Sequence, residues 1–322
     1  MKTQLPSGRS QPRFSGIATF LRVPRATDVA GSGAALDWAL FGVPFDGGVT
    51  FRPGARFGPR AVREASQYIK PYSIEQRVHV AERLSLADAG DAPVSPYSCE
   101  QTSRMVTEFA CGLGDPATTR LLAVGGDHSV AYANIRATWQ RRGRPAGGLA
   151  LVHFDAHMDT VDEVWGERYG HASPFRRAIE DGCVDAKAMI SIGIRGSLNT
   201  PDDLAFAKDH GVTVVTMDDW RRTGAQTLAA FLARVRGRET YLSFDVDAVD
   251  PAFCPGTGTP VCGGFSSAEA LGIVRALRGE GAAPILPLVG ADIVEVLPDR
   301  DPAGITSMFA AQLMLEVLAL SA

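Results

Sequence analysis

The sequence predicts an α/β fold in which a parallel β-sheet is covered by helices on both faces. Short apolar, β-rich runs alternate with longer helical patterns along the whole chain, and several of these runs are apolar at every position. A strand that is apolar throughout is typical of a sheet covered on both sides. Regular alternation of strands and helices favours parallel rather than antiparallel pairing.

Eight runs are predicted to be strands: Trp38–Val43, Leu84–Asp88, Arg120–Val124, Gly148–Phe154, Ala188–Ile194, Thr213–Thr216, Thr240–Phe244 and Ile285–Ala291. The predicted helices are Gly58–Ser66, Ser98–Gly112, Ser129–Arg141, Pro174–Glu180, Pro201–His210, Ala225–Arg236, Ser266–Leu277 and Pro302–Leu320. No Gly/Ser/Pro-rich linker and no internal repeat interrupts them, so we expect a single domain over residues 16–322. Residues 1–15 are mostly polar and contain two prolines and a glycine, which predicts a flexible N-terminal arm.

Composition excludes several classes of function. The 322 residues are 45% hydrophobic and 21% charged, as in soluble globular proteins. A formal net charge of −4 does not favour nucleic acid or an anionic membrane surface as a partner. No run of about 18 apolar residues and no secretory signal is found. The five cysteines are scattered and form no Cys-x-x-Cys pair, which indicates reduced thiols in the cytoplasm; only Cys254 lies close to a candidate site loop.

Three polar segments each end a predicted strand. They are Gly-Gly-Asp-His-Ser at 125–129, His-Phe-Asp-Ala-His-Met-Asp at 153–159 and Ser-Phe-Asp-Val-Asp-Ala-Val-Asp-Pro at 243–251. Ligands of parallel α/β sheets bind outside the carboxyl ends of the strands, so these segments are expected to converge. Carboxylates gathered in one place repel each other unless a cation joins them. The number of candidate ligands suits two divalent metals bridged by shared aspartates, which predicts a hydrolase that activates water.

Spacing and chemistry select the ligands within these segments. Asp155, His157 and Asp159 are two residues apart, which puts their side chains on one face of an extended chain, and Asp245 and Asp247 repeat this spacing. In the first segment we prefer His128 as the ligand, with Asp127 orienting it.

Two further polar residues of these segments are expected to be structural. His153 follows an apolar run and should be a buried, hydrogen-bonded histidine, and Asp250 before Pro251 should cap or turn the chain. Because hard aspartates outnumber imidazoles and no thiolate takes part, Mn²⁺ is favoured over Zn²⁺.

Together with Gly42–Gly48, Arg52–Arg60, Gly256–Pro260 and Asp292–Val296, the three segments resemble the signature motifs of the ureohydrolases, the family of arginase and agmatinase. The resemblance runs in order from about residue 15 to 320. It implies a three-layer α/β/α sandwich around an eight-stranded parallel sheet, two Mn²⁺ per subunit and assembly into homo-oligomers, either trimers or hexamers.

The resemblance also implies individual roles. One metal would be held by His128, Asp155, Asp159 and Asp245, and the other by His157, Asp155, Asp245 and Asp247. His171 matches a loop histidine that exchanges protons with solvent, although it is also placed to cap the helix near Pro174. Glu295 matches the glutamate that binds the guanidinium group, and Thr259 matches a threonine near the reacting centre. Ala172 departs from the glycine usual after the loop histidine.

These roles define a reaction. Paired cations lower the pKa of a shared water so that it can attack the guanidinium carbon. Glu295 would orient the substrate through a charge-assisted contact. Asp159 would pass on a proton, and His171, with an ordinary pKa near 6.5, would exchange it with solvent. The products would be urea and an amine.

The substrate's distal end is less constrained by the sequence. Val161 and Leu198 stand where arginases have polar residues for the amino-acid head group, so arginine is disfavoured. We expect agmatine, yielding putrescine and urea, because Asp162, Glu163 and Glu167 make the loop before His171 acidic and Trp165 offers a cation–π contact. The alternative is guanidinobutyrate or another guanidino acid, with Arg52 or Arg56 meeting the carboxylate. Remoter alternatives are a single-zinc deacetylase-like enzyme and a non-catalytic family member.

Overall fold

The computed structural model describes residues 2–29, 35–279 and 286–322, and its centre is one eight-stranded parallel sheet. The strand order is β4-β1-β5-β10-β9-β6-β7-β8, and each neighbouring pair runs parallel. The strands are β1 (Trp38–Val43), β4 (Leu86–Asp91), β5 (Arg120–Gly125), β6 (Leu149–Phe154), β7 (Val184–Ile194), β8 (Thr213–Thr216), β9 (Thr240–Asp245) and β10 (Leu288–Val294). The short β2 (Tyr72–Ser73) and β3 (Val78–His79) form a separate antiparallel pair.

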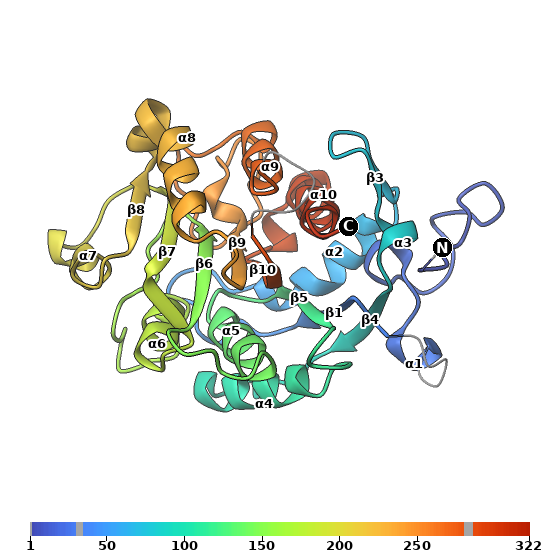
Figure 1. Ribbon diagram of the computed structural model, residues 1–322, viewed down its shortest axis with the longest axis horizontal. Helices are drawn as coiled ribbons and strands as arrows, with labels where there is room; N and C mark the ends of the chain where they lie inside the picture. The colour runs from blue at the N-terminus through green and yellow to red at the C-terminus, as the bar shows by residue number, and fades with distance from the viewer. Residues whose placement is uncertain (1, 30–34, 280–285) are drawn as a thin grey trace.

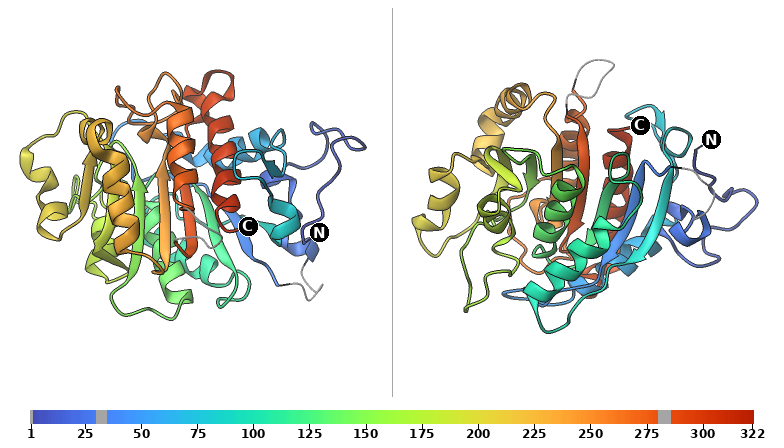
Figure 2. Two further views of the ribbon diagram at one scale, coloured as in Figure 1. Left: turned by 45° about the horizontal axis from the view of Figure 1, so that its top comes forward. Right: turned by 60° about the horizontal axis from the view of Figure 1, so that its bottom comes forward.

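Helices cover both faces of the sheet, so the predicted three-layer architecture is confirmed (Figures 1 and 2). One layer contains α4 (Cys99–Cys111), α5 (Val130–Arg141) and α6 (Pro174–Glu180). The other contains α2 (Gly58–Ser66), α8 (Met217–Arg234), α9 (Ser267–Ala276) and α10 (Ile305–Ala319). The short α7 (Ala205–Asp209) lies beside β8, and α1 (Ala26–Val29) and α3 (Val80–Arg83) lie near the N-terminal segment.

The sequence located every strand of the large sheet but missed some boundaries. The strand predicted from Leu84 begins at Leu86, because Leu84 ends the unpredicted helix α3. Helix α8 begins eight residues before the predicted Ala225, because Thr216 caps it by accepting a hydrogen bond from Asp219 N–H at 3.1 Å. Residue 285, where the last strand was predicted to start, lies outside the described residues, and β10 continues to Val294.

The strand order explains why distant segments meet. β5, β10, β9 and β6 are four adjacent strands in the middle of the sheet. The polar segments 125–129, 153–159 and 243–251 stand at the carboxyl ends of β5, β6 and β9, and Glu295 directly follows β10. Parallel pairing brings these four ends to the same edge.

The N-terminal segment is anchored at several places, among them Thr3 and Arg13, whose guanidinium donates to the Gln67 carbonyl at 3.1 Å and the Ile69 carbonyl at 3.3 Å. Thr3 is buried, its N–H donates to the Ala81 carbonyl at 2.9 Å, and its hydroxyl accepts from Leu86 N–H at 2.9 Å. Leu5 packs against the main core, whereas residues 6–12 are exposed.

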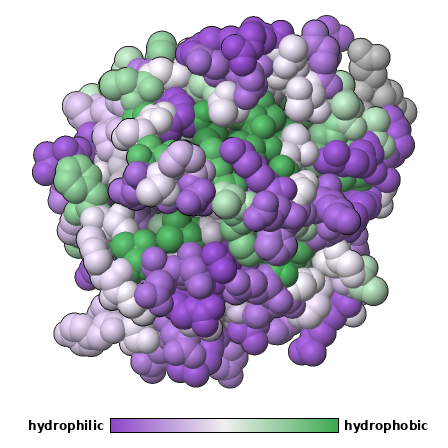
Figure 3. All heavy atoms as spheres, turned by 90° about the vertical axis from the view of Figure 1, so that its left-hand side faces the viewer, coloured by the Kyte–Doolittle hydropathy of each residue, from purple (hydrophilic) through white to green (hydrophobic). Residues whose placement is uncertain are grey.

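Helix α10 is a core helix. Residues Pro302–Ala319 are long and apolar enough to cross a membrane by composition, but 67% of this stretch is buried inside the protein. Its packing against α2 and α9 accounts for that burial. On the face at the β8 edge, polar side chains form most of the surface, and apolar groups show mainly in the recesses between them (Figure 3).

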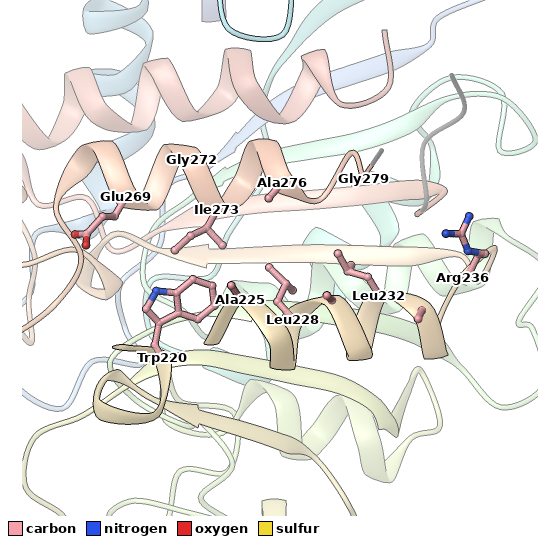
Figure 4. A pocket seen from close by; sticks show the side chains of 12 residues that line it. Trp220, Ala225, Leu228, Leu232, Arg236, Glu269, Gly272, Ile273, Ala276 and Gly279 are labelled. Atoms are coloured by element: carbon pink, nitrogen blue, oxygen red, sulfur yellow. The ribbon is translucent and has the colours of Figure 1, made fainter. Parts of the chain in front are cut away.

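A groove of about 770 Å³ lies between α8 and α9 (Figure 4). Its walls are mainly apolar or small, among them Leu228, Leu232, Ile273 and Ala276, and Arg236 and Glu269 stand at opposite ends. None of the predicted metal ligands lines it. This groove is therefore large but is not the expected active site.

Glu316 connects three elements behind the sheet. Its buried carboxylate accepts hydrogen bonds from Arg275 at 2.8 Å, Gln76 at 2.7 Å and Gln312 at 3.1 Å. Burial acts to raise the pKa of Glu316, but these donors outweigh burial and lower the pKa.

We expect Glu316→Gln to lower the free energy of unfolding by about 1–3 kcal/mol at neutral pH, because Arg275 and Gln76 lose a charged acceptor. A carboxyl with a lowered pKa stabilises the folded state above its ordinary pKa and loses this effect as the pH falls through the folded value. The difference from wild type in urea unfolding should therefore shrink as the pH approaches about 4. Glu100→Gln, which removes only an exposed contact with Arg104 at 3.5 Å, serves as control. A penalty that does not change with pH would contradict this role of the Glu316 charge.

Candidate active site

The predicted ligands of the first metal surround His128. The ring of His128 is buried, and its Nδ1 lies 3.0 Å from Asp155 Oδ2, 3.0 Å from Asp159 Oδ2 and 3.3 Å from Asp245 Oδ2. None of these contacts gives Nδ1 a well-directed hydrogen bond. A buried imidazole nitrogen facing three carboxylate oxygens without a hydrogen bond is the arrangement expected of metal ligands.

The predicted ligands of the second metal lie beside the first group. His157 Nδ1 is 3.0 Å from Asp247 Oδ2 and 3.3 Å from Asp155 Oδ1. The two oxygens of Asp155 therefore face different histidines, as a bridging carboxylate requires. Asp155, His157 and Asp247 are close enough together to hold one ion, and the His157 side chain is 39% exposed, so this end of the cluster reaches solvent.

The protonation equilibria of the cluster reflect crowded negative charge. Burial and the neighbouring carboxylates of Asp247 and Asp155 raise the pKa of Asp245 well above its ordinary value. Burial and Asp155 likewise raise the pKa of Asp247. For Asp155, burial acts to raise the pKa, but the close contacts with His128, His153 and His157 outweigh burial and lower the pKa. Cations at this place would relieve the repulsion, so the residues present fit divalent metal ions.

His153 and Asp250 have the structural roles predicted for them. His153 is buried, with Nδ1 3.0 Å from Ser191 Oγ and Nε2 2.9 Å from Asp155 Oδ2. These two contacts use both ring nitrogens. His153, His128 and Asp155 also lie close enough for one ion, but the free nitrogen of His128 makes it the better ligand. Asp250 accepts hydrogen bonds from Ala252, Gly263 and Gly264 N–H groups and so closes a turn.

The prediction that Asp127 orients His128 is wrong. His128 Nε2 lies 2.9 Å from Ser243 Oγ, and Ser243 Oγ donates to Asp292 at 2.6 Å. Asp127 points elsewhere and accepts from Gly48 N–H at 2.8 Å and Ser129 N–H at 3.0 Å. The reason is the sharp turn after β5, which separates the two neighbouring side chains.

Glycine at position 126 makes that turn possible. A Cβ on Gly126 would lie 1.5 Å from the Phe45 carbonyl oxygen, so no other residue fits without moving the backbone. In the same place Asp127 N–H donates to the Phe45 carbonyl at 2.8 Å, and Glu295 N–H donates to the Gly126 carbonyl at 2.9 Å. The loops after β1, β5 and β10 are thus tied together.

Glu295 and His171 form a second polar group next to the metal cluster. His171 Nδ1 lies 2.9 Å from Glu295 Oε1, which also accepts from His128 N–H at 2.9 Å. The other oxygen, Glu295 Oε2, is buried, and none of the described residues forms a hydrogen bond with it. His171 does not cap α6, since Ser173 occupies that position. Burial acts to lower the pKa of His171, but Glu295, Asp127 and Asp159 outweigh it and raise the pKa to about 9.

Three non-glycine residues of the predicted site have a left-handed backbone. The φ angles are 52° at Asp159, 54° at Trp165 and 65° at Glu295. Such conformations cost about 1–3 kcal/mol each and persist where the surrounding structure enforces them. At Asp159 and Glu295 the left-handed conformation turns the backbone, so that the carboxylate side chain points into the site.

Thr259 and Trp165 lie at different distances from the cluster. Thr259 Oγ1 donates to Asp247 Oδ2 at 3.3 Å, so it belongs to the site. Trp165 lies at the tip of a tight turn and is 84% exposed. It lines a cavity of about 230 Å³ together with Thr50 and Glu167. The structure brings all ten predicted site residues to the same end of the sheet, with Trp165 at the rim.

The acidic loop before His171 does not offer a free carboxylate at Asp162. Asp162 lies 2.5 Å from Arg177, 3.2 Å from Arg168 and 3.5 Å from Arg176. Glu167 accepts from Tyr169 N–H at 2.7 Å. The expectation that Asp162 serves a substrate ammonium group is therefore wrong, because neighbouring arginines already neutralise it.

Sequence reasoning missed two supporting residues. Arg195 donates to the carbonyls of Asp247 at 2.6 Å and Val261 at 2.7 Å, which joins the loop after β9 to the loop that carries Thr259. Thr50 contacts the His171 ring. Arg195 directly follows β7, and a charged residue at the carboxyl end of a strand is a sequence signal for a site residue. Nothing in the local sequence distinguishes Thr50.

Comparison with known proteins agrees with this geometry. The model of the arginase family matches residues 36–320. The chain belongs to the arginase family. It is 46% identical to guanidinopropionase of Pseudomonas aeruginosa over 97% of this chain and 93% of that protein.

Two further members of the arginase family span nearly the same length. The solved structure of proclavaminate amidinohydrolase from Streptomyces clavuligerus has a TM-score of 0.86 and 38% identity, and covers 96% of this chain and 98% of that one. Agmatinase of Gallus gallus is 36% identical over 97% of this chain and 88% of that protein.

We expect Asp245→Asn to lose bound metal and more than about 100-fold in activity, because this carboxylate is predicted to contact both ions and even supporting contacts are worth 10–100-fold. Metal retained after gel filtration of Mn²⁺-loaded protein can be measured by elemental analysis. Asp218→Asn, an exposed change on α8, should retain the wild-type metal content. Wild-type metal content and turnover in the Asp245→Asn variant would refute the bridging role.

Proposed function

We propose that this protein is a binuclear-metal amidinohydrolase that cleaves a guanidino acid to urea and an amino acid. The observation that carries the proposal is the joint placement of the metal cluster and Glu295 at the ends of four adjacent strands. Two subsets of ligands, around His128 and around His157, support two ions rather than a single zinc. We assign Mn²⁺ to both positions because hard carboxylates dominate the ligand set.

The metal ions would supply one function, which is to lower the pKa of a shared water to a range where it attacks a carbon electrophile at neutral pH. The protein supplies the rest. Glu295 Oε2 is buried and has no hydrogen-bond partner in the described part of the chain, so a guanidinium group that donates to it would satisfy this carboxylate oxygen. Glu295 Oε1 remains held by His171 and His128 N–H, which fixes the direction of Oε2.

Two residues are placed to handle protons. Asp159 Oδ2 faces His128 Nδ1 at 3.0 Å and is the carboxylate of the first group that is not expected to bridge, so it is available to accept a proton during the attack. His171 Nδ1 contacts Glu295 Oε1 and stands beside the place where the leaving amine would form. We assign His171 the exchange of protons with solvent.

The rim of the site supports a carboxylate at the far end of the substrate. Arg56 forms an ion pair with the buried carboxylate of Asp46, so it is not available to a substrate carboxylate. The Arg52 guanidinium stacks on Phe51, 4.7 Å from the ring centre, and the ion pairs of the described residues give it no carboxylate partner.

Arg52 is also close to the site. A Cβ on Gly258 would lie 2.9 Å from the Arg52 carbonyl oxygen and 3.6 Å from Glu295 Oε2. An arginine side chain spans about 7 Å, so Arg52 can reach the far end of a short substrate whose guanidinium contacts Glu295.

Relatives support the same choice. Guanidinopropionase and proclavaminate amidinohydrolase, whose names denote the hydrolysis of acids, resemble the chain more than the Gallus gallus agmatinase does. With Asp162 neutralised by arginines, the acidic loop offers one carboxylate fewer to agmatine. We therefore propose a guanidino acid, with 3-guanidinopropionate as the first substrate to test.

Urea release from 3-guanidinopropionate, 4-guanidinobutyrate, agmatine and arginine tests this proposal. We expect the acids to be favoured, and Arg52→Ala to raise KM for the acids by about 10- to 100-fold while changing KM for agmatine little, because only the acids lose a charged hydrogen bond. Arg60→Ala, an exposed change on α2, is the matched control. Preference for agmatine in the wild type, or an equal loss on all substrates in Arg52→Ala, would contradict a guanidino acid as substrate.

His171→Asn should lower kcat by about 100-fold or more with both metals still bound, because a proton-transfer group is lost without a change in the ligands. His210→Asn changes an exposed histidine and should leave kcat unchanged. If the His171→Asn protein loses metal instead, elemental analysis will show that His171 supports the metal centre and not proton exchange.

A further inference from the structure

His171 is held by a hydrogen bond at each ring nitrogen. Nδ1 lies 2.9 Å from Glu295 Oε1, while Nε2 accepts a hydrogen bond from Thr50 N–H at 2.9 Å and lies 2.8 Å from Thr50 Oγ1. A backbone N–H group can only donate, so this hydrogen bond requires an Nε2 that carries a lone pair and no proton. A carboxylate accepts, so the single proton of the neutral ring is on Nδ1. The two partners together select one tautomer.

The loop that carries Thr50 is fixed relative to His171. Gly48 N–H donates to Asp127 Oδ2 at 2.8 Å, and the Gly48 carbonyl accepts from His171 N–H at 3.0 Å. A Cβ on Gly48 would lie 3.1 Å from Asp127 Oδ2, 3.1 Å from Gly170 Cα and 3.2 Å from His171 N. Only glycine lets the loop approach this closely. The contact between Thr50 and the His171 ring is thus set by the backbone.

The other side of Thr50 faces a cavity. The cavity has a volume of about 230 Å³, and its walls include Thr50, Val164, Trp165 and Glu167. A water molecule takes about 30 Å³ in the liquid, so several waters fit. Thr50 is half-buried, with its hydroxyl against His171 Nε2. Thr50 therefore contacts the His171 ring and also lines the cavity.

Two influences on His171 oppose each other. The carboxylates of Glu295 after β10, Asp127 after β5 and Asp159 after β6 favour a protonated ring. Thr50 N–H favours the neutral ring, because it would meet a second N–H if Nε2 were protonated. The orientation of this N–H group suits the neutral ring, so the contact with Thr50 is the one made when His171 has released its second proton.

We propose, on the basis of the proposed function, that Thr50 is a positioning residue that keeps His171 in the Nδ1–H tautomer and relays protons between His171 and the cavity. In the uptake step an acid in the cavity gives a proton to Thr50 Oγ1 while the hydroxyl proton passes to His171 Nε2. One O–H bond and one N–H bond form, one O–H bond and one bond in the acid break, and the ring becomes cationic without any redox change. Release is the reverse step.

Nitrogen NMR of the full-length protein labelled with ¹⁵N-histidine tests the tautomer. Two-bond and three-bond couplings distinguish a protonated from an unprotonated ring nitrogen, and His171→Gln assigns the signal among the six histidines. We expect protonated Nδ1 and unprotonated Nε2 in the neutral ring, observed above the raised pKa of about 9. A neutral ring that carries its proton on Nε2 instead of Nδ1 would overturn the proposal. This result does not depend on which substrate the enzyme hydrolyses.

Thr50→Val tests the relay, since it removes the hydroxyl but keeps the shape and the backbone N–H. We expect kcat to fall about tenfold or more with KM nearly unchanged. The pKa of His171 measured by NMR should rise by about half to one pH unit, since the neutral ring loses one donor.

Thr50→Ser should restore both quantities, and Thr223→Val, an exposed change on α8, should affect neither. Unchanged kcat and unchanged His171 pKa in Thr50→Val would refute the relay. If no guanidino compound is hydrolysed, the proposed function fails, and the spectra still decide the tautomer.

Discussion

The structure depends on one electrostatic constraint, which is that four aspartates meet at the carboxyl ends of central strands where little solvent can screen them. Burial and mutual repulsion raise the pKa values of Asp245 and Asp247, whereas three histidines lower that of Asp155. Such a cluster needs positive charge to hold it together. The order of the strands brings these carboxylates together, because β5, β10, β9 and β6 are neighbours in space although they are far apart in the chain.

Around the cluster, the loops after several strands are joined by polar contacts that leave little freedom. Gly48 N–H donates to Asp127, and the Gly48 carbonyl accepts from His171 N–H. The His171 ring contacts Glu295, which also accepts from the N–H of His128, the residue after Asp127. This closed circuit places the group that would bind a guanidinium cation next to the group that would exchange protons. The left-handed backbone at Glu295 is tolerated because these contacts compensate for its cost.

Much of this could be predicted from the sequence. Apolar runs located every strand of the large sheet, and the i, i+2 spacing of acidic residues identified the ligands, because both signals are local. The roles of Asp127 and Asp162 were predicted wrongly for one reason. Each depends on a partner that is remote in sequence or fixed by a sharp turn, namely Gly48 for Asp127 and three arginines for Asp162. Thr50 was missed for the same reason. Homo-oligomer assembly and a cytoplasmic location stay predictions.

The central claim is that two divalent ions occupy this cluster in the active enzyme. Crystals of Mn²⁺-loaded protein, measured at the manganese absorption edge, test it most directly. The account predicts two anomalous peaks in each subunit, one between His128 and Asp159 and one between His157 and Asp247, with Asp155 and Asp245 contacting both. A single peak, or none, in protein from the same preparation that releases urea would contradict it.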